Sequence, residues 1–257
     1  MTRFAKPLAL RPDPRQREGG DVPDTAMLLA AGLGKRMRPL TATRPKPLVE
    51  VGGATLLDHA LDHVRAGGIG RVVVNVHHYA DALEAHLKRA AGDLDVTVSD
   101  ERAELLETGG GVARAGALLG AKPFFVINTD NVWIDGPIDT LRLLAARWDD
   151  AAMDALLLVV PLARATAHGG AGDFHMDAAG RLRRRGPRRI APFVYTGVQL
   201  VSPRLLESAP GGAFSFNLLW DRAIADGRAH GIVHQGLWCD VGAPGNIPQA
   251  EEMLRRG

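Results

Sequence analysis

Short apolar runs alternate with longer amphipathic runs along the chain from residue 26 onward. The apolar runs predict strands over residues 26–31, 71–76, 94–98 and 123–128, and the amphipathic runs predict helices over residues 56–66, 80–91 and 111–119. Two of the apolar runs, Val72–Val74 and Phe124–Ile127, lack polar alternation, which is typical of strands covered on both faces. Strands and helices in turn predict an α/β fold with a doubly wound, mostly parallel, Rossmann-like sheet.

The second half of the chain is less regular. Strands are predicted over residues 155–161, 193–201 and 231–241, helices over residues 218–225 and 247–256, and a hairpin or loop over the glycine- and arginine-rich residues 169–189. A length of 257 residues is ordinary for one α/β domain, so residues 25–257 are predicted to form a single domain. Residues 1–24 contain four prolines and the Gly19–Gly20 pair, and they predict a flexible N-terminal extension.

Composition limits the classes of protein and partner. An apolar fraction of 46%, a charged fraction of 23% and a net charge of +2 are typical of a globular protein without a nucleic-acid partner. The basic run Arg181–Arg185 lacks the interleaved aromatic residues of a nucleic-acid surface. No apolar run approaches the roughly 18 to 20 residues that span a membrane. The single cysteine, Cys239, excludes a disulfide framework within the chain and favours a cytoplasmic location.

A glycine turn rich in cations follows the first predicted strand. Gly32 and Gly34 allow the backbone to approach a ligand closely. Four cations lie within the same stretch, namely Lys35, Arg36, Arg38 and Lys46. This combination predicts a phosphate ligand, although a tight turn with solvated cations would show the same pair of glycines. The ATPase loop Gly-x-x-x-x-Gly-Lys-Ser/Thr is absent, and Met37 replaces the third glycine of Gly-x-Gly-x-x-Gly.

The longer string LAAGLGKRMRPLT at residues 29–41, with RPKPL at residues 44–48, resembles the signature of the sugar-1-phosphate nucleotidylyltransferases. These enzymes join a nucleoside triphosphate to a sugar 1-phosphate and release pyrophosphate. ETGGG at residues 107–111 and VINTD at residues 126–130 are similar to later family segments, so the resemblance extends from Met27 to the C-terminus. It implies an enzyme with the nucleotide-diphospho-sugar transferase fold. Few residues follow Asp240, so no C-terminal β-helix is expected.

The family's reaction brings together two anionic reactants, which repel each other unless their charge is neutralised. By resemblance, Arg36 binds the departing β- and γ-phosphates and Lys46 bridges the α-phosphate and the sugar phosphate, so these two are the expected catalytic residues. The resemblance also implies that Asp130, together with Asp240 in GLWCDVG at residues 236–242, holds Mg²⁺ as cofactor. In this chain Thr129 replaces the glycine that the family commonly has before the first metal aspartate.

The remaining site residues also follow from the resemblance. Those expected to bind the nucleotide are Ala30, Ala31, Gly32, Gly34, Glu101 and Gly109. Those expected to bind the sugar phosphate are Gly110, Asp173, Thr196 and Gly197. Alternatives remain open for several of them, because glycine runs are often only turns, an isolated glutamate such as Glu101 is usually solvated, and Asp173 can be a turn residue.

Within the family, ETGGG at residues 107–111, Gly172–Phe174 and Trp238–Gly242 are most similar to the members that use UTP and N-acetylmuramate α-1-phosphate in bacterial cell-wall recycling. Mannose-1-phosphate guanylyl transfer and glucose-1-phosphate thymidylyl or uridylyl transfer are the alternatives. A non-catalytic, nucleotide-sensing homologue is an alternative of another class. That last hypothesis predicts loss of the arginine, the lysine or the metal aspartates, and all four are present. The sequence does not fix an oligomeric state.

Overall fold

Nine strands form one sheet in the computed structural model, which describes residues 21–187 and 189–256. They are β1 (Thr25–Leu29), β4 (Arg71–Val76), β5 (Asp95–Asp100), β6 (Phe124–Asn128), β8 (Ala155–Pro161), β9 (Phe174–Met176), β10 (Leu182–Arg184), β11 (Phe193–Val201) and β12 (Ala229–Val233). Strands β5, β4, β1 and β6 are parallel neighbours, and β8 and β12 form a second parallel pair. The predicted α/β fold with a mostly parallel sheet is therefore confirmed.

Strand β11 joins the two parallel groups and runs antiparallel to both. It pairs with β6 on one side and with β8 on the other, and its register with β8 shifts between Tyr195 and Gln199. At its start, Phe193 pairs with Phe174 of β9, which continues into the antiparallel β9–β10 hairpin. This hairpin confirms the hairpin alternative for the glycine- and arginine-rich segment.

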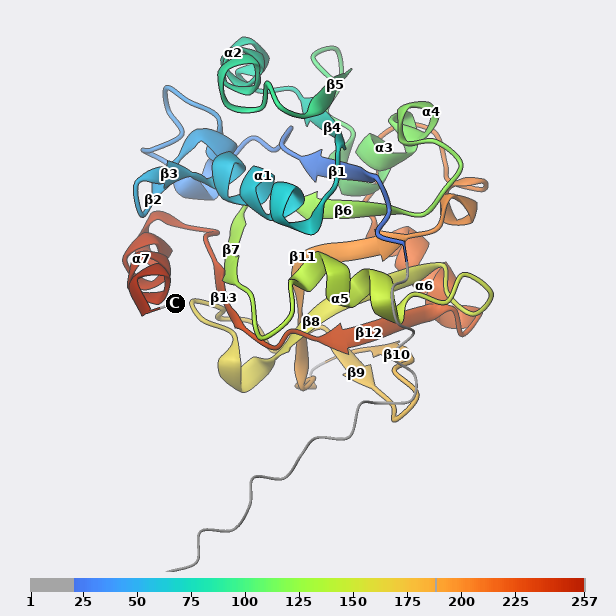
Figure 1. Cartoon of the computed structure of the whole chain (residues 1–257). Helices are drawn as coiled ribbons and strands as arrows, with labels where there is room; N and C mark the ends of the chain where they lie inside the picture. The colour runs from blue at the N-terminus through green and yellow to red at the C-terminus, as the bar shows by residue number, and fades with distance from the viewer. Residues whose placement is uncertain (1–20, 188, 257) are drawn as a thin grey trace, which may run out of the picture.

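Helices cover both faces of the sheet (Figure 1). On one face lie α1 (Leu56–Gly67), α2 (Ala80–Ala90) and α5 (Thr140–Arg147), and on the other lie α3 (Glu107–Arg114), α4 (Gly116–Leu119) and α6 (Asn217–Ala225). Successive residues of a strand point to opposite faces, so Ala26 and Leu28 pack into the first core while Met27 packs into the second. All three are fully buried, which explains why the strand lacks polar alternation.

A third apolar cluster lies beside the carboxyl ends of the parallel strands. Here β7 (Asn131–Ile134) pairs with β13 (Leu237–Asp240), and α7 (Ile247–Arg256) covers the pair together with the short hairpin of β2 (Glu50–Val51) and β3 (Ala54–Thr55). Met37, which follows the glycine turn, is buried in the same cluster as Cys239 of β13. The end of the chain is thus packed against the turn that follows β1.

Two predicted elements differ in their bounds. The strand expected over residues 231–241 is divided into β12 and β13, because the chain turns at Gly236 to pass against the backbone of Ile134 so closely that a Cβ would not fit. The helix expected over residues 111–119 begins at Glu107 and breaks into α3 and α4. Three consecutive glycines weaken the helical pattern, yet tertiary packing holds them in α3. Strand β7 and helix α5 were not predicted.

Residues 1–20 of the predicted extension lie outside the described residues. Asp21–Asp24 lead directly into β1, where the carbonyl of Asp24 accepts a hydrogen bond from the Arg71 amide at 3.0 Å and Val22 packs against the core. Within residues 21–187 and 189–256, no helix has the length and apolar character needed to cross a membrane.

A partly buried carboxylate ties the turn after β7 to α1 and α5. Asp135 accepts hydrogen bonds from the Thr140 amide at 3.1 Å and from the Thr140 hydroxyl, and its other oxygen lies 3.5 Å from Nδ1 of His63. Burial raises the pKa of Asp135, but the hydrogen bonds from His63 and Thr140 outweigh it and bring that pKa to about 2. The ionised carboxylate therefore stabilises the fold.

Replacing Asp135 by asparagine should remove this charge while retaining an acceptor for Thr140. At pH 7 we expect the free energy of unfolding to fall by about 1–2 kcal/mol, discounted for partial exposure of the carboxylate. Because the pKa of Asp135 is lowered in the folded state, its contribution to stability is complete above pH 3.8 and is lost as the pH falls through about 2. The difference in the free energy of unfolding between wild type and variant should therefore shrink on acidification. Urea unfolding of both proteins at several pH values between pH 7 and pH 3 measures this difference. The exposed Asp95→Asn is the control, and an equal loss in both variants would contradict the assignment.

Candidate active site

A cavity of about 410 Å³ opens at the carboxyl ends of β1, β4 and β6. It is lined by Leu29, Ala30, Ala31, Gly32, Lys46, Pro47, Asn75, Leu105, Glu107, Thr108, Asn128, Thr129, Asp130 and Ser215. The carboxyl edge of a parallel sheet is where α/β proteins bind ligands. Five residues predicted to bind substrates or metal therefore line one cavity: Ala30, Ala31, Gly32, Lys46 and Asp130.

The glycine turn after β1 brings the two cationic segments together. Gly34 has a φ of 59°, and a Cβ there would lie 3.0 Å from the Cβ of Lys46 and 3.0 Å from Cγ2 of Thr41. The Thr41 hydroxyl donates to the Gly34 carbonyl at 2.8 Å. Gly34 thus closes the turn against Lys46 instead of lining the cavity, and Arg36 is exposed and does not line the cavity either.

Lys46 and Asp130 form an ion pair inside the cavity. The distance between Nζ and Oδ2 is 2.9 Å, and the side chains are 12% and 33% exposed. Lys46 lies between Pro45 and Pro47, and proline fixes φ, so the backbone on both sides of the lysine is restricted. A cation is therefore held at Asp130, two residues after the end of β6.

The second predicted metal aspartate lies beside the first. Asp240 of β13 pairs with Asn131 of β7, and the Val241 amide donates to the Asp130 carbonyl at 3.0 Å. Burial and the negative charge of Asp130 raise the pKa of Asp240, although the charges of Lys46 and Arg36 lower it. A divalent cation would offset the negative charges of these two neighbouring carboxylates, and oxygen ligands suit Mg²⁺.

Glu101 is buried beneath the cavity and does not line it. It is 1% exposed, and it accepts hydrogen bonds from Nδ2 of Asn75 at 2.7 Å and from the Leu106 amide at 3.2 Å. Asn75 in turn accepts a hydrogen bond from the Ala30 amide at 2.7 Å. Glu101 therefore holds the Asn75 side chain, and Asn75 in turn holds the backbone of Ala30, the first residue after β1. Asn75 was not predicted, because an asparagine near a strand end carries no motif.

Gly109 and Gly110 pack against a loop, not against the cavity. Both amides donate to the Phe214 carbonyl, at 2.9 and 3.0 Å, and a Cβ on Gly109 would overlap the Phe214 ring. This contact, with the hydrogen bond from the Phe216 amide to the Thr108 hydroxyl at 2.9 Å, holds Ser215 beside the first turn of α3, and Ser215, Glu107 and Thr108 all line the cavity. Glu107, Thr108 and Ser215 were not predicted as site residues, although Glu107 and Thr108 directly precede the predicted glycines Gly109 and Gly110.

Two of the predicted sugar-phosphate residues, Thr196 and Gly197, lie in β11, and Asp173 contacts the same strand. Thr196 is fully buried, and its hydroxyl donates to the Leu158 carbonyl at 3.0 Å. Gly197 faces Asn131, the residue next to Asp130. Asp173 accepts a hydrogen bond from the Tyr195 amide at 2.9 Å and so fixes the start of β11. These three side groups do not line the 410 Å³ cavity, and neither does Gly110.

Thr129 replaces a glycine without disturbing the strand. Its hydroxyl donates to the Leu29 carbonyl at 2.8 Å, so the side chain is satisfied by the neighbouring strand β1. Thr129 is 3% exposed, and the methyl-bearing side chain is largely withdrawn from the cavity that it lines. The departure from the family pattern is accommodated by one hydrogen bond.

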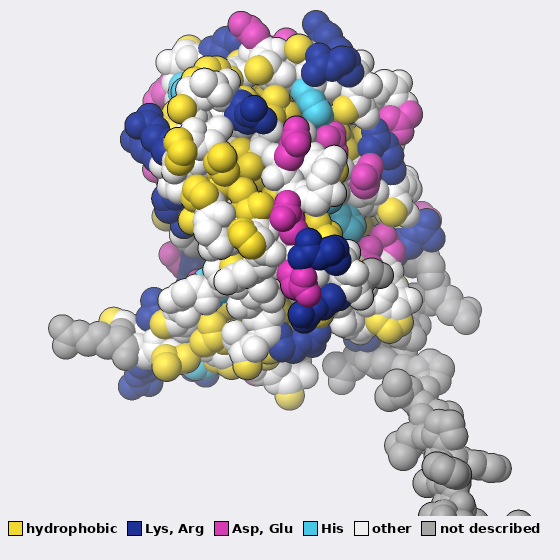
Figure 2. Space-filling view, turned by 90° about the vertical axis from the view of Figure 1, so that its left-hand side faces the viewer, with side chains coloured by type: hydrophobic (Ala, Val, Ile, Leu, Met, Phe, Trp, Pro, Cys, Tyr) yellow, Lys and Arg dark blue, Asp and Glu magenta, His cyan; other side chains and the backbone are white. Residues whose placement is uncertain are grey.

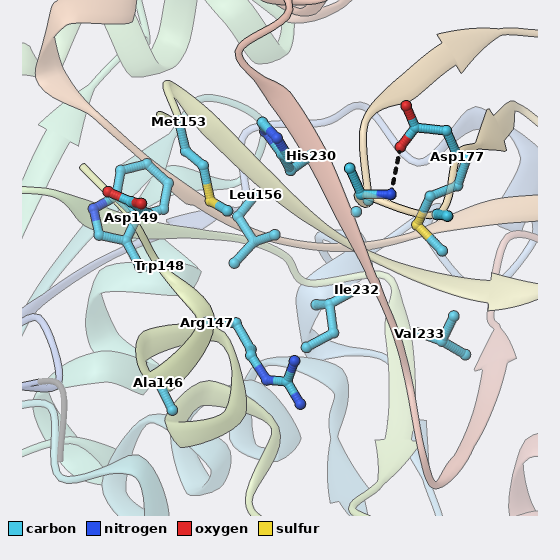
Figure 3. Close-up of a pocket in the computed structure, with 15 residues that line it drawn as sticks. Ala146, Arg147, Trp148, Asp149, Met153, Leu156, Asp177, His230, Ile232 and Val233 are labelled. Carbon is cyan, nitrogen blue, oxygen red and sulfur yellow. Dashed lines mark hydrogen bonds between the residues drawn. The ribbon is translucent and has the colours of Figure 1, made fainter. Parts of the chain in front are cut away.

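A larger cavity of about 630 Å³ lies elsewhere, between the end of α5, β8, the β9–β10 turn and β12 (Figure 3). Met153, Leu156 and Ile232 contribute apolar surface to it, and the buried His230 lies at its edge. Burial lowers the pKa of His230. None of the residues predicted to bind substrate or metal lines this cavity, so the larger cavity is not the one that gathers the predicted site residues.

Comparison with known proteins identifies the family of the chain. Residues 25–181 match the family model described as nucleotidyl transferase. The chain is 46% identical over 235 residues to N-acetylmuramate alpha-1-phosphate uridylyltransferase of Caulobacter vibrioides, covering 90% of this chain and 97% of that protein. It is 28% identical to mannose-1-phosphate guanyltransferase of Aspergillus fumigatus, covering 85% of this chain and 61% of that protein.

Solved structures show the same fold at low sequence identity. The inositol-1-phosphate CTP transferase from T. maritima aligns with a TM-score of 0.75 and 17% identity, covering 93% of this chain and 99% of that chain. The arrangement of strands and helices around the site is thus shared by proteins that have few residues in common.

The contact between Glu101, Asn75 and α3 predicts the effect of one added methyl group. A Cβ at Gly111 would lie 2.7 Å from Oε1 of Glu101 and 2.9 Å from Nδ2 of Asn75. Gly111→Ala should therefore lower the free energy of unfolding by about 1–3 kcal/mol, the usual cost of overpacking. Gly116→Ala is the control, since its nearest neighbour would be 3.7 Å away. Chemical denaturation measures both, and equal stability of the two variants would show that the network does not constrain α3.

Proposed function

The chain belongs to the nucleotidyl transferase family, and from that premise we propose that it transfers uridylyl from UTP to N-acetylmuramate α-1-phosphate and releases pyrophosphate. The observation that carries the proposal is the convergence of Lys46, Asp130 and Asp240 beside a cavity large enough for a nucleoside. The choice of base and sugar is supported by the 46% identity to the Caulobacter vibrioides protein over nearly its whole length. Cell-wall recycling in the cytoplasm is the setting that such substrates imply.

Lys46 and Arg36 are proposed to neutralise the phosphates. The Lys46 ammonium, held at the inner end of the cavity, would lie between the α-phosphate and the attacking sugar phosphate. A Cβ on Gly242 would lie 3.4 Å from Nη1 of Arg36 and 3.0 Å from Oδ1 of Asp240, so the guanidinium lies beside the second carboxylate. From there Arg36 can bind the departing pyrophosphate through two parallel hydrogen bonds.

Asp130 and Asp240 are proposed to hold Mg²⁺, and their oxygen donors and adjacent negative charges fit that ion. A bound Mg²⁺ would neutralise phosphate oxygens and orient the leaving group. Ala31, Gly32 and the first turn of α3 would bind the nucleoside. Gly110, Asp173, Thr196 and Gly197 are proposed to act on the sugar-phosphate side by shaping the backbone, since their side groups lie outside the cavity.

Guanylyl transfer to mannose 1-phosphate is the second candidate, favoured by the 28% identity to the Aspergillus fumigatus protein. Glucose-1-phosphate thymidylyl or uridylyl transfer is a further alternative. A non-catalytic sensor is not favoured, because Arg36, Lys46, Asp130 and Asp240 are all present. Nucleic acid is not proposed as a partner, and on the face drawn in Figure 2 cationic and anionic side chains are interspersed.

A substrate panel tests the proposed reaction. Pyrophosphate release should be measured with UTP, GTP, dTTP and CTP, each combined with N-acetylmuramate α-1-phosphate, mannose 1-phosphate and glucose 1-phosphate in the presence of Mg²⁺. We expect the highest kcat/KM for UTP with N-acetylmuramate α-1-phosphate. A preference for GTP with mannose 1-phosphate would replace this assignment by the second candidate, and no turnover with any pair would overturn the enzymatic proposal.

Replacing Lys46 by methionine tests the proposed chemistry. The variant keeps the apolar stem but loses the charge, so kcat should fall by about 100-fold or more while the KM for UTP changes less. Lys88→Met, on the exposed side of α2, should keep kcat within about twofold. Steady-state kinetics of the two variants provide the measurement, and a Lys46→Met enzyme with near-normal kcat would exclude the proposed role.

A further inference from the structure

We propose that Asn131 is a positioning residue that fixes Asp130 for a divalent cation, and that residue 197 must be glycine to admit the Asn131 amide. The proposal rests on the metal role proposed above for Asp130. It concerns a side chain that no motif selected. It is based on the contacts of the Asp130 oxygen that does not pair with Lys46.

The Asn131 amide is bound directly to the carboxylate. Its Nδ2 donates to Oδ1 of Asp130 at 2.9 Å, and Asn131 is 6% exposed. An ionised carboxylate only accepts hydrogen bonds, so the amide must present its nitrogen. Asn131 is also the residue of β7 that pairs with Asp240 of β13. It therefore lies between the two predicted metal ligands and in contact with one of them.

Gly197 provides the space for this amide. It lies where the register of β11 with β8 shifts, has a φ of 90°, and packs so closely on Asn131 that a Cβ would overlap Nδ2. The same Cβ would lie 3.1 Å from the Cβ of Asn128. On the other side, Nε1 of Trp238 donates to the Thr196 carbonyl at 2.9 Å and ties β11 to β13. The backbone of β11 that packs on Asn131 is thus held in place by its hydrogen bond to β13.

The two oxygens of Asp130 consequently have different surroundings. Oδ1 is held by a short, buried side chain with no room to move, whereas Oδ2 is paired with Lys46. A lysine stem has several rotatable bonds, so its ammonium can leave at small cost. A cation entering the site should therefore take the place of the ammonium at Oδ2 while Asn131 keeps its hydrogen bond. The metal ion and the Lys46 ammonium therefore compete for Oδ2 of Asp130, because Asn131 occupies Oδ1.

Binding of Mn²⁺ to the full chain without nucleotide tests this arrangement, followed by the enhancement of water proton relaxation. Asn131→Ala should weaken Mn²⁺ affinity about 10-fold, within the range for residues that orient metal ligands. Gly197→Ala should weaken it similarly by displacing the amide. Lys46→Met should instead strengthen it several-fold, because the competing cation is gone. A residue with a merely structural role would not produce opposite effects on the two sides of one carboxylate.

Gly227→Ala is the matched control for Gly197→Ala. It has a φ of 68° and no atom within 4 Å of an added Cβ, so it incurs the backbone strain without displacing a neighbour, and Mn²⁺ affinity should stay within twofold of wild type. Thermal unfolding identifies any variant that fails to fold. The proposal is overturned if folded Asn131→Ala and Gly197→Ala proteins bind Mn²⁺ within twofold of wild type, or if the wild-type protein does not bind Mn²⁺.

Asp130→Ala separates this proposal from the proposed function. If Asp130→Ala binds Mn²⁺ as wild type does, the metal assignment itself is wrong. If Asp130→Ala loses affinity but Asn131→Ala does not, only the positioning role fails, and the proposed function stands. Supporting results are a loss of affinity in Asp130→Ala, Asn131→Ala and Gly197→Ala together with a gain in Lys46→Met.

Discussion

The ion pair between Lys46 and Asp130 joins residues that lie 84 positions apart in the chain, and much of the surrounding structure serves to bring them together. Asp130 follows a strand at the middle of the sheet, and Lys46 is placed by the glycine turn that leaves the neighbouring strand β1. Asp240 reaches the same edge only because β13 pairs with the segment after Asp130. Without the cation, two partly buried carboxylates would repel each other, so charge balance is the constraint on this region.

Glycines set the spacing around these charged groups. Gly34, Gly111 and Gly197 each lie where an added Cβ would approach a side chain of the site or of its support: Lys46, Asn75 and Asn131 respectively. Each therefore allows a neighbouring side chain to pack directly on backbone. Gly109 is similar, but the partner is a loop that forms a wall of the cavity. The glycines of the family signature thus shape the site largely from behind, and only Gly32 among those predicted lines the cavity itself.

The sequence was sufficient for the parallel strands and for the charged half of the site. Apolar runs such as Val72–Val74 are long and unbroken because both faces of each strand are covered, and the family resemblance identified Lys46, Asp130 and Asp240. It was not sufficient for β7, which is only four residues long, or for the division of β12 from β13, which depends on a close contact with Ile134 distant in sequence. Asn75, Asn131 and Ser215 were missed for the same reason, since Asn75 contacts Ala30, Asn131 is confined by Gly197, and Ser215 is held beside α3, each by a segment distant in sequence.

The cavity has two chemically distinct halves, and this division bears on how related enzymes can differ in their nucleotide. One half carries Lys46 and Asp130, with Asp240 and Arg36 close by. The other is formed by backbone after β1, by the neutral groups of Asn75, Thr108 and Ser215, and by the single carboxylate of Glu107. Phosphate transfer depends on charge, whereas discrimination between bases depends on a few directed hydrogen bonds. The second half is built on α3 and on the loop that packs on it, so under the proposed function substitutions there would change the preferred base while the ion pair and the two carboxylates keep their positions.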